Sequence, residues 1–347
     1  MLNLLTTELR NGQTLSDSQI ASAVADLINE QISAISKAEF LTALALKGET
    51  WMELSAFARE LRKLSIAPPL DAAMREREIL DVCGTGGDRL NTFNISTTVA
   101  LVAAAGGVTV AKHGNRAITS SSGSADVLEE LGIPVYLSPD AAARSLATHN
   151  FAFFFAQHFH PAFKHIGAAR KLCAEAGQRT IFNILGPLLN PARPTAQLVG
   201  VPRPEFCEKI AHVLQSLGVR RAMVVSGEVG DAFLDEISSL GKTHLAEFYQ
   251  DKGFNQSCLE PQNFPLQPAT LADLQGGDKQ ASAKIIRNVL SGQERGPKRD
   301  AVLLNAAAAF FLAGRSRTLL DGFDYAAEVI DSGKAHEKLV SLASQPR

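Results

Sequence analysis

The chain has 347 residues, of which 46% are hydrophobic and 20% are charged. This composition excludes a disordered or fibrous protein, and the length predicts about two domains with a large core. Lys and Arg number 34 against 36 Asp and Glu, so the net charge of −2 provides no overall positive field for nucleic acid or acidic membranes. Any anion that the protein binds must therefore be held by a local site.

The cysteines and the N-terminus favour a cytoplasmic protein. The four cysteines form no C-x-x-C pair, which excludes a zinc ribbon or a thioredoxin-type motif and predicts reduced thiols. The N-terminus turns polar before a signal-peptide core could form, and the longest Ala- and Leu-rich runs fall short of the ~20 residues that span a bilayer. We expect a cytoplasmic location and no membrane partner.

Residues 1–68 are predicted to form a small all-helical domain. Apolar residues recur at helical spacing behind three candidate N-cap residues, Ser16, Ser36 and Thr50. Pro68 ends this unit, since a proline does not continue a helix. The apolar stripes exceed what one short bundle can bury, so we expect part of segment 158–190, or a partner subunit, to cover them.

Residues 70–347 are predicted to form a larger α/β domain with a mainly parallel central sheet, because short β-rich runs alternate with helical segments. The predicted strands are Ile79–Val82, Val108–Lys112, Val135–Leu137, Phe151–Phe155, Leu198–Val201, Ala222–Val225 and Thr243–Phe248. The predicted helices include 97–105, 125–131, 139–148, 205–217, 301–313 and 324–332. Residues 251–268 are predicted to be the most loop-like stretch.

A glycine-rich run, Gly84-Thr85-Gly86-Gly87-Asp88, follows the first predicted strand. Glycines let the backbone approach a ligand, and the start of the next helix adds N–H donors, so the run predicts an anion site. No Gly-Lys-Ser/Thr follows, and Arg89 stands where G-x-G-x-x-G needs its third glycine, which argues against ATP hydrolysis and NAD chemistry. An ordinary glycine turn explains this run alone about equally well.

A second polar run, residues 113–126, follows the next predicted strand and again leads into a helix. Ligands of open α/β sheets bind at the carboxyl ends of adjacent strands, where both runs are expected to lie. Lys112 and Arg116 supply positive charge, and the serines and threonines supply hydrogen-bond donors. A polar linker would explain the serines but not the basic residues and glycines beside them, so the two runs together predict a phosphate site.

Several motifs in register resemble the anthranilate phosphoribosyltransferases, which have the nucleoside phosphorylase and phosphoribosyltransferase fold. The motifs are 84–88, 92–97, 112–116, 123–126, His160-Pro161-Ala162, 179–188, Asn190-Pro191-Ala192 and Asp235-Glu236-Ile237-Ser238. The resemblance spans nearly the whole chain. It implies an enzyme of tryptophan biosynthesis that transfers the phosphoribosyl group of phosphoribosyl pyrophosphate (PRPP) to the amine of anthranilate and releases pyrophosphate, without a covalent nucleophile.

Matched residue by residue, the resemblance implies a set of ligand contacts. For PRPP they are Gly84, Gly87, Asp88, Thr92, Asn94, Ile95, Ser96, Thr97, Lys112, His113, Gly114, Asn115, Arg116, Ala117, Ile118, Thr119, Ser120 and Ser124. For anthranilate they are Gly84, Asn115 and Arg170, and the planar fork of an arginine suits a benzoate carboxylate. For Mg²⁺ they are Ser96, Asp235 and Glu236, oxygen ligands of the kind this ion prefers. The resemblance also implies a homodimer through the helical domain.

Two segments, 170–179 and 227–234, are longer than the usual family spacing, and the second makes Asp231 a further candidate ligand. Three alternatives stay open at this point. A pyrimidine-nucleoside phosphorylase shares the fold but normally carries a Ser-Gly-Arg-Gly type second loop, and a non-catalytic nucleic-acid-binding relative would show a basic groove and eroded motifs. A phosphoribosyltransferase for another aromatic amine is the third. The spacing of His158, His160 and His165 resembles a zinc site, but such histidines are more often hydrogen-bonded polar residues.

Overall fold

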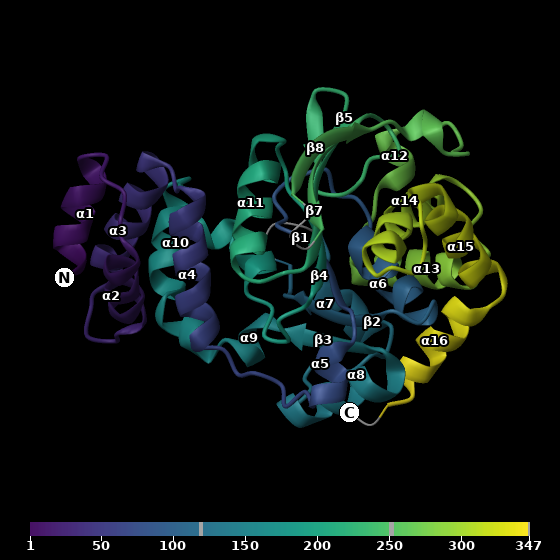
Figure 1. Ribbon diagram of the computed structural model, residues 1–347, viewed down its shortest axis with the longest axis horizontal. Helices are drawn as coiled ribbons and strands as arrows, with labels where there is room; N and C mark the ends of the chain where they lie inside the picture. Colours follow the sequence, from purple (N-terminus) through teal and green to yellow (C-terminus); the bar gives the residue numbers. More distant parts are fainter. Residues whose placement is uncertain (118–120, 250–252, 346–347) are drawn as a thin grey trace.

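One twisted sheet with helices on both faces makes up most of the molecule, and a group of helices from the N-terminus stands to one side of it (Figure 1). The computed structural model describes residues 1–117, 121–249 and 253–345. No helix within these ranges combines the length and apolar character needed to cross a membrane. The mainly parallel α/β fold beside a helical unit confirms the fold class predicted from the sequence.

Four helices form the N-terminal unit: α1 (Leu2–Arg10), α2 (Asp17–Ile28), α3 (Ala34–Lys47) and α4 (Trp51–Lys63). Ser16 and Thr50 cap α2 and α4, each within a reciprocal capping box. The prediction that Ser36 caps the next helix was wrong. Ser33 accepts a hydrogen bond from the backbone N–H of Ser36 and starts α3 one turn earlier, because Ala34 and Ile35 also fit the helix.

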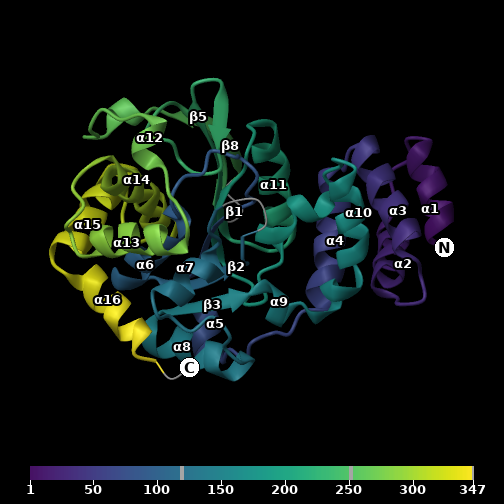
Figure 2. The ribbon, with the colours of Figure 1, turned by 180° about the vertical axis from the view of Figure 1, so that it is seen from behind.

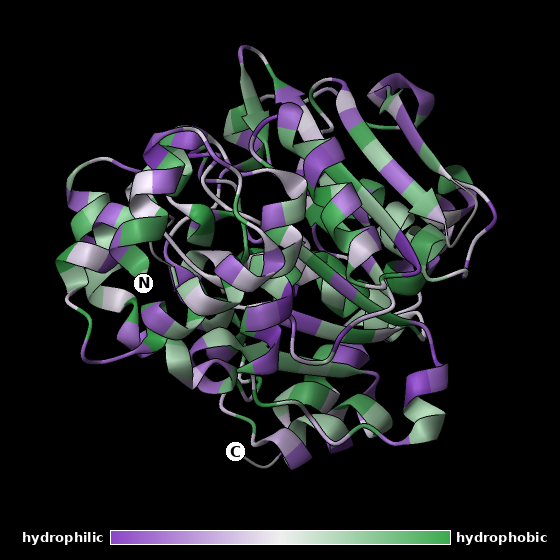
Figure 3. Ribbon diagram, turned by 60° about the vertical axis from the view of Figure 1, so that its left-hand side comes forward, coloured by the Kyte–Doolittle hydropathy of each residue, from purple (hydrophilic) through white to green (hydrophobic). Residues whose placement is uncertain are grey.

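A segment from the middle of the chain returns to the helical unit. Helix α10 (Gly167–Glu175) packs on α3 and stands beside α4 (Figure 2). The Arg62 side chain at the end of α4 donates to the carbonyl of Leu188 at 2.6 Å, which ties the unit to the α/β part. Hydrophobic and hydrophilic residues alternate around the helices near the N-terminus (Figure 3). The boundaries at residues 68 and 70 remain a prediction.

The described residues form an eight-stranded sheet in the order β3-β2-β1-β4-β5-β7-β8, with β6 paired to β5. The first five of these strands run parallel, and β6, β7 and β8 join antiparallel. The strands are β1 (Ile79–Gly84), β2 (Thr109–Gly114), β3 (Phe151–Phe155), β4 (Ala196–Gly200), β5 (Arg221–Val229), β6 (Ala232–Leu234), β7 (Thr243–Tyr249) and β8 (Phe254–Leu259).

Helices bury both faces of the sheet. Helix α11 (Glu205–Ser216) covers the face toward the helical unit, and its core merges with that of α1–α4. The other face carries α6 (Ile95–Ala105) and α14 (Pro297–Leu312), with α13 (Lys279–Leu290), α15 (Leu319–Asp331) and α16 (Lys334–Ala343) around them (Figure 1). Helix α8 (Pro139–His149) packs on β3, α7 (Ser124–Glu130) packs on α13, and three short helices complete the α set: α5 (Ala72–Glu76), α9 (Ala156–Phe159) and α12 (Leu271–Leu274).

Two local predictions were wrong. Val135–Leu137 is not a strand, because the run lies between Pro134 and Pro139 and pairs with no strand of the described residues. Residues 251–268, predicted to be a loop, contain β8 and a short 3₁₀ helix at Pro261–Asn263. Strand β8 escaped prediction because it is a largely exposed edge strand without an apolar alternation. The predicted cysteine chemistry agrees with the structure, where all four thiols are free.

Candidate active site

A sharply bent glycine loop follows β1 at the carboxyl edge of the sheet. Four of its residues adopt left-handed backbone angles: Gly86 (φ 72°), Gly87 (φ 88°), Arg89 (φ 62°) and Asn91 (φ 55°). A neighbouring segment braces the loop, since Phe93 donates its N–H to the carbonyl of Leu274 at 3.0 Å and Thr92 forms a β-bridge with Gln275. The loop thus reaches the start of α6 in a defined shape.

The acidic pair Asp235-Glu236 contacts this loop, although the two lie far apart in the sequence. Asp235 Oδ2 accepts the backbone N–H of Gly86 at 2.7 Å, and Glu236 Oε1 accepts that of Ser96 at 3.0 Å. Ser96 lies in the first turn of α6, where the helix dipole favours a carboxylate. The structure therefore brings together the three residues predicted as metal ligands.

Two glycines make room for the acidic pair. Gly84 and Gly200 are register partners on β1 and β4. A Cβ on Gly84 would lie 2.2 Å from Asp235 Oδ2, and a Cβ on Gly200 would lie 1.6 Å from the backbone oxygen of Asp235. The backbone at Asp235 can rest against these two strand ends only because neither has a side chain.

Three carboxyl groups crowd together at this point. Burial, and next the charge of Asp88, raise the pKa of Asp235 to about 7. Burial, and next the charge of Asp235, raise the pKa of Glu236 to about 8, while Lys112 opposes that rise. The ionised forms of these carboxyl groups are therefore disfavoured where the glycine loop meets the sheet, and a bound cation would stabilise them.

Lys112 lies behind the loop rather than at its surface. Its ammonium is buried and donates to the carbonyl of Val82 at 2.7 Å and to Ser96 Oγ at 3.3 Å. Burial lowers the pKa of Lys112. The side chain thus holds Ser96 in position and supplies a positive charge beneath the carboxyl cluster.

The second polar run is organised by Asp126 in α7. Its carboxylate accepts from the backbone N–H groups of Ala117 (2.9 Å) and Gly123 (3.1 Å) and from Arg116 Nη1 (2.7 Å). Arg116 also donates to Glu129 and Tyr136, so its guanidinium is engaged by protein partners. The Asp126 carboxylate therefore connects Arg116 and Ala117 to Gly123.

The two runs touch each other. Asn94 Nδ2 donates to the carbonyl of Ser122 at 3.1 Å. Asn115 Oδ1 accepts the N–H of Arg116 at 2.8 Å, and Gly114 lies close to Ser124. The side chains of Ile95 and Thr97 are buried in α6, which leaves their backbone for any ligand contact. The predicted contacts Ile118, Thr119 and Ser120 lie outside the described residues.

A row of rings leads from β2 toward the helical unit. The centroid of His113 lies 5.3 Å from that of His160, His160 lies 5.0 Å from Phe163, and Phe163 lies 5.7 Å from Phe182. The guanidinium of Arg170 in α10 stacks 5.3 Å from the Phe182 ring. Arg170 therefore lies at the opposite end of this row from the glycine loop.

The groups at the two ends of this row have complementary chemistry. Burial lowers the pKa of His113 to about 3, and His113 Nδ1 lies 3.1 Å from the carbonyl of Gly186, so the imidazole is neutral. Its Nε2 has no hydrogen-bond partner among the described residues. Burial also lowers the pKa of Arg170, which forms no ion pair within the described ranges. His113 thus offers a neutral hydrogen-bond acceptor at one end of the row, and Arg170 offers a positive charge without an ion-pair partner among the described residues at the other.

The buried His160 predicts a measurable pH dependence of stability. Burial lowers its pKa to about 4, so the unfolded chain binds more protons than the folded one below its ordinary pKa of about 6.5. Stability should therefore fall as pH falls. Between pH 6.5 and 5 we expect the wild type to lose about 1.5 kcal/mol more than His160→Gln, measured by urea unfolding. Equal losses of stability in the wild type and His160→Gln would contradict the role of His160. His336→Gln, at an exposed position, is the control.

The acidic pair is positioned by Asn305, a buried residue of α14 that the sequence analysis missed. Its Oδ1 accepts the N–H of Ile237 and its Nδ2 donates to the carbonyl of Ile237, both at 2.9 Å. The sequence did contain a signal for Asn305, because a polar residue within the apolar run Leu303-Leu304-Asn305-Ala306 indicates a buried side chain with hydrogen-bond partners. Gly200, and Arg179, which donates to the carbonyl of Gly87 at 3.1 Å, were also missed.

Replacing Asn305 by alanine should loosen the acidic pair. Three buried side-chain hydrogen bonds are lost, two to Ile237 and one to the carbonyl of Ala301, so we expect a loss of about 2–4 kcal/mol of stability. Activity per folded molecule should fall about tenfold, because misplaced catalytic groups lose rate steeply. Asn288→Ala on α13 is the matched control. A variant with unchanged unfolding and activity would contradict the positioning role.

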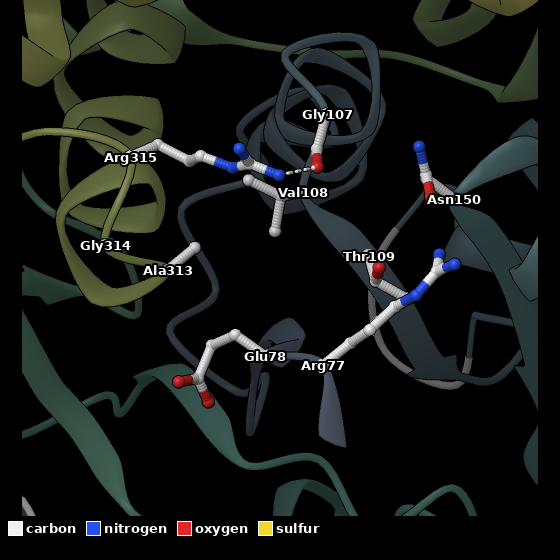
Figure 4. A pocket seen from close by; sticks show the side chains of 9 residues that line it. All are labelled: Arg77, Glu78, Gly107, Val108, Thr109, Asn150, Ala313, Gly314 and Arg315. Atoms are coloured by element: carbon white, nitrogen blue, oxygen red, sulfur yellow. Dashed lines mark hydrogen bonds between the residues drawn. The ribbon is translucent and has the colours of Figure 1, made fainter. Parts of the chain in front are cut away.

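A cavity of about 500 Å³ lies at the opposite edge of the sheet and takes no part in this arrangement. It is lined by residues before β1, β2 and β3 and by the end of α14, including Arg77, Glu78 and Arg315 (Figure 4). The glycine loop follows the carboxyl end of β1, so the strands separate the two places.

Comparison with known proteins agrees with this geometry. Residues 76–336 match the glycosyl transferase family a/b domain, and residues 4–65 match the helical bundle domain of the same family. An anthranilate phosphoribosyltransferase of Petrotoga mobilis is 43% identical over 342 residues, 99% of this chain and 96% of that protein. The chain belongs to the anthranilate phosphoribosyltransferase family. A relative of the same name from Methanocorpusculum labreanum is 50% identical over 87% of this chain and 86% of its own.

Solved structures of the family have the same fold. The anthranilate phosphoribosyltransferase of Thermus thermophilus superimposes with a TM-score of 0.88 at 39% identity, covering 98% of each chain. The Saccharomyces cerevisiae enzyme, solved with PRPP and Mg, gives 0.87 at 28% identity, covering 99% of this chain and 98% of its own. These relatives are transferases, which supports the transferase interpretation rather than a pyrimidine-nucleoside phosphorylase.

Proposed function

We propose that this chain transfers the phosphoribosyl group of PRPP to the amine of anthranilate, giving N-(5-phosphoribosyl)anthranilate and pyrophosphate. The observation that carries the proposal is the meeting of the glycine loop, the start of α6 and the acidic pair through the bonds of Asp235 to Gly86 and of Glu236 to Ser96. The activity of the relatives, and the yeast structure with PRPP and Mg, support the same reaction. A cytoplasmic location stays a prediction.

We assign PRPP to the edge formed by the glycine loop and by residues 112–117 and 121–124. Backbone N–H groups at a loop and a helix start favour phosphate, and Asn94 and Ser124 add side-chain groups. Transfer builds positive charge on the ribose and negative charge on the departing pyrophosphate. Donors held in place before the reaction stabilise that leaving group, so a covalent nucleophile is not needed.

We assign Mg²⁺ to Ser96, Asp235 and Glu236, with Asp88 beside them. The raised pKa values of Asp235 and Glu236 fit this assignment, since a cation would offset the crowded negative charge. The described residues contain no group of three His, Cys, Asp or Glu side chains arranged to hold a metal by themselves. Phosphate oxygens of PRPP would complete such a site, and bound magnesium would neutralise charge on the pyrophosphate.

We assign anthranilate to the row of rings between His113 and Arg170. An aromatic acid can stack along this row with its carboxylate at the guanidinium of Arg170, which forms no ion pair with the described residues. The amine of anthranilate attacks with a neutral lone pair and loses its proton afterwards. A weak acceptor therefore suffices, such as Nε2 of His113, which has no hydrogen-bond partner in the part of the chain that the structure describes. The long segment 170–179 extends α10 and its following turn beyond Arg170, which keeps the arginine in the helix.

An assay of anthranilate fluorescence tests the proposal. Consumption of anthranilate should require both PRPP and Mg²⁺ and should not occur when either is omitted. Consumption of a different aromatic amine, with anthranilate left untouched, would favour the third alternative. Phosphorolysis of thymidine without any transfer to anthranilate would overturn the proposal.

Arg170→Ala is expected to raise the KM for anthranilate about 30-fold and to change the KM for PRPP little, because a charged hydrogen-bonding group is lost. Lys171→Ala is the matched control, since Lys171 is the next residue of α10 and its side chain is 78% exposed. An Arg170→Ala variant with an unchanged KM for anthranilate would contradict the acceptor assignment.

We also propose that the chain forms a homodimer through its helical unit. A groove of about 690 Å³ runs between α1, α3 and α10, and Ile35 and Leu46 at this surface are 65% and 74% exposed. Apolar surface of this kind is typical of an interface. Light scattering of the wild type should give a molar mass of twice the 37.1 kDa of one chain. The Leu46→Glu variant should have the mass of a single chain. A monomeric wild type would contradict the dimer.

A further inference from the structure

Cys258 lies in a cluster of three side chains that take no part in the site described above. It is exposed on β8, whereas Cys83, Cys173 and Cys207 are buried. Cys258 is the register partner of His244 on β7, and its Sγ lies 3.9 Å from His244 Nδ1. Glu228 on β5 completes the cluster, with its Oε1 2.9 Å from His244 Nε2. The three residues thus come from the neighbouring strands β5, β7 and β8 (Figure 1).

The contacts of His244 with Glu228 and Cys258 allow the imidazole to act as a base toward the thiol. In the tautomer with hydrogen on Nε2, His244 donates a hydrogen bond to the Glu228 carboxylate, and the lone pair of Nδ1 is then available to the thiol. Glu228 also stabilises the imidazolium that forms when Nδ1 accepts the thiol proton. A cross-strand Cys–His pair is common without a third group, and it is Glu228 that orients the imidazole here.

Charged side chains surround the cluster. Lys242 interacts electrostatically with Cys258 and forms an ion pair with Glu260 at 3.3 Å. Glu228 and Glu260 are the acidic groups that face the cluster, and both have a cationic or imidazole partner. An exposed thiol beside a histidine and a lysine is the environment in which cysteines react fastest.

We propose that Cys258, His244 and Glu228 form a reactive-thiol site that exchanges with low-molecular-weight disulfides. Nδ1 of His244 accepts the thiol proton, and the Cys258 sulfur attacks one sulfur of the disulfide. An S–S bond forms to Cys258 while the S–S bond of the reagent breaks. The leaving thiolate carries away the electron pair and accepts the proton from His244, so that Cys258 is oxidised and the disulfide is reduced.

The cluster is connected to the segment that carries the acidic pair. The backbone of Glu228 accepts from Ser238 Oγ at 2.7 Å and donates to the carbonyl of Lys242 at 2.6 Å. A Cβ on Gly241 would lie 2.7 Å from the Glu228 oxygen, so there is little free space at this contact. A group attached to Cys258 that moves the backbone of Glu228 would also shift Ser238 and Lys242, which are bonded to it. This coupling rests on the proposed function, whereas the thiol reactivity does not.

The reactivity is tested with 5,5′-dithiobis(2-nitrobenzoate) on the folded chain at neutral pH. Cys258 should react about five times faster than glutathione, because His244 Nδ1 lies beside its sulfur and can accept the thiol proton. Cys258→Ser should remove this phase, His244→Gln should slow it to the glutathione rate, and the surface control His336→Gln should leave it unchanged. Equal rates in the wild type and His244→Gln, or a wild-type rate no faster than glutathione, would overturn the proposal.

The coupling is tested with protein converted to the mixed disulfide by oxidised glutathione. The Mg²⁺ concentration for half-maximal activity should rise about tenfold and return to its starting value after reduction with dithiothreitol. Treated Cys258→Ser should not change. An unchanged magnesium requirement would overturn the coupling alone. Absence of transferase activity in untreated protein would overturn the proposed function, and the thiol result would then still stand.

Discussion

Gly200→Ala is expected to lower kcat/KM for PRPP at least about 100-fold, because a displacement of catalytic groups by an ångström has an effect of this size. The added Cβ would lie 1.6 Å from the backbone oxygen of Asp235, a distance that no rearrangement of Gly200 alone can relieve. Asp235 must then move away from β4 and from the N–H of Gly86 that it accepts. Overpacking should also cost about 1–3 kcal/mol of stability.

The control for this variant is Gly167→Ala. Gly167 is the first residue of α10, and a Cβ there meets no atom within 4 Å, so we expect unchanged activity and slightly higher stability. Both variants should be compared by steady-state kinetics and by urea unfolding. A folded Gly200→Ala variant with wild-type kinetics would show that the close approach of Asp235 to β4 is not needed for the reaction.

Glu236→Gln is expected to lower activity about 100-fold or more while leaving the chain folded. The amide oxygen of glutamine can still accept the N–H of Ser96, so the local backbone is retained and only the charge is lost. Removing one of three crowded carboxyl groups should raise the stability of the metal-free chain, since burial and the charge of Asp235 already raise the pKa of Glu236 to about 8. Calorimetric titration with Mg²⁺ and PRPP should show weakened joint binding.

Asp231→Asn is the matched control for the lost charge. The long segment 227–234 folds into the hairpin of β5 and β6, and Asp231 lies exposed at its tip between Val229 and Ala232. We therefore expect its activity to stay within about twofold of the wild type, as is usual for surface substitutions. A large loss in Asp231→Asn together with a small loss in Glu236→Gln would contradict the magnesium assignment.

The fold was predictable where hydrophobic pattern decides the structure. The buried strands β1 to β5 and the apolar helices α6 and α14 appear close to their predicted positions, because strands buried on both faces are continuously apolar. Edge strands lack that pattern. Strand β8 is mostly exposed and polar, so nothing in its composition distinguished it from a loop. Val135–Leu137 had the apolar pattern of a strand but pairs with no strand of the described residues.

The candidate site was predictable only in part. The motifs indicated that the glycine loop and the acidic pair belong to one site, but not that Asp235 and Glu236 accept from Gly86 and Ser96. Those contacts depend on the register that places β4 beside β1. Gly200 gave no signal, since a single glycine at a strand end has many explanations. The cluster of Cys258, His244 and Glu228 likewise depends on the pairing of three antiparallel strands.

The central claim is that one site joins PRPP and anthranilate. The most direct test is the stoichiometry of products, with pyrophosphate measured enzymatically and the anthranilate product identified by mass spectrometry in the same reaction. Equal amounts of pyrophosphate and N-(5-phosphoribosyl)anthranilate, formed only with Mg²⁺, are expected. Pyrophosphate released without an anthranilate adduct, or an adduct formed with another amine in preference, would contradict the claim.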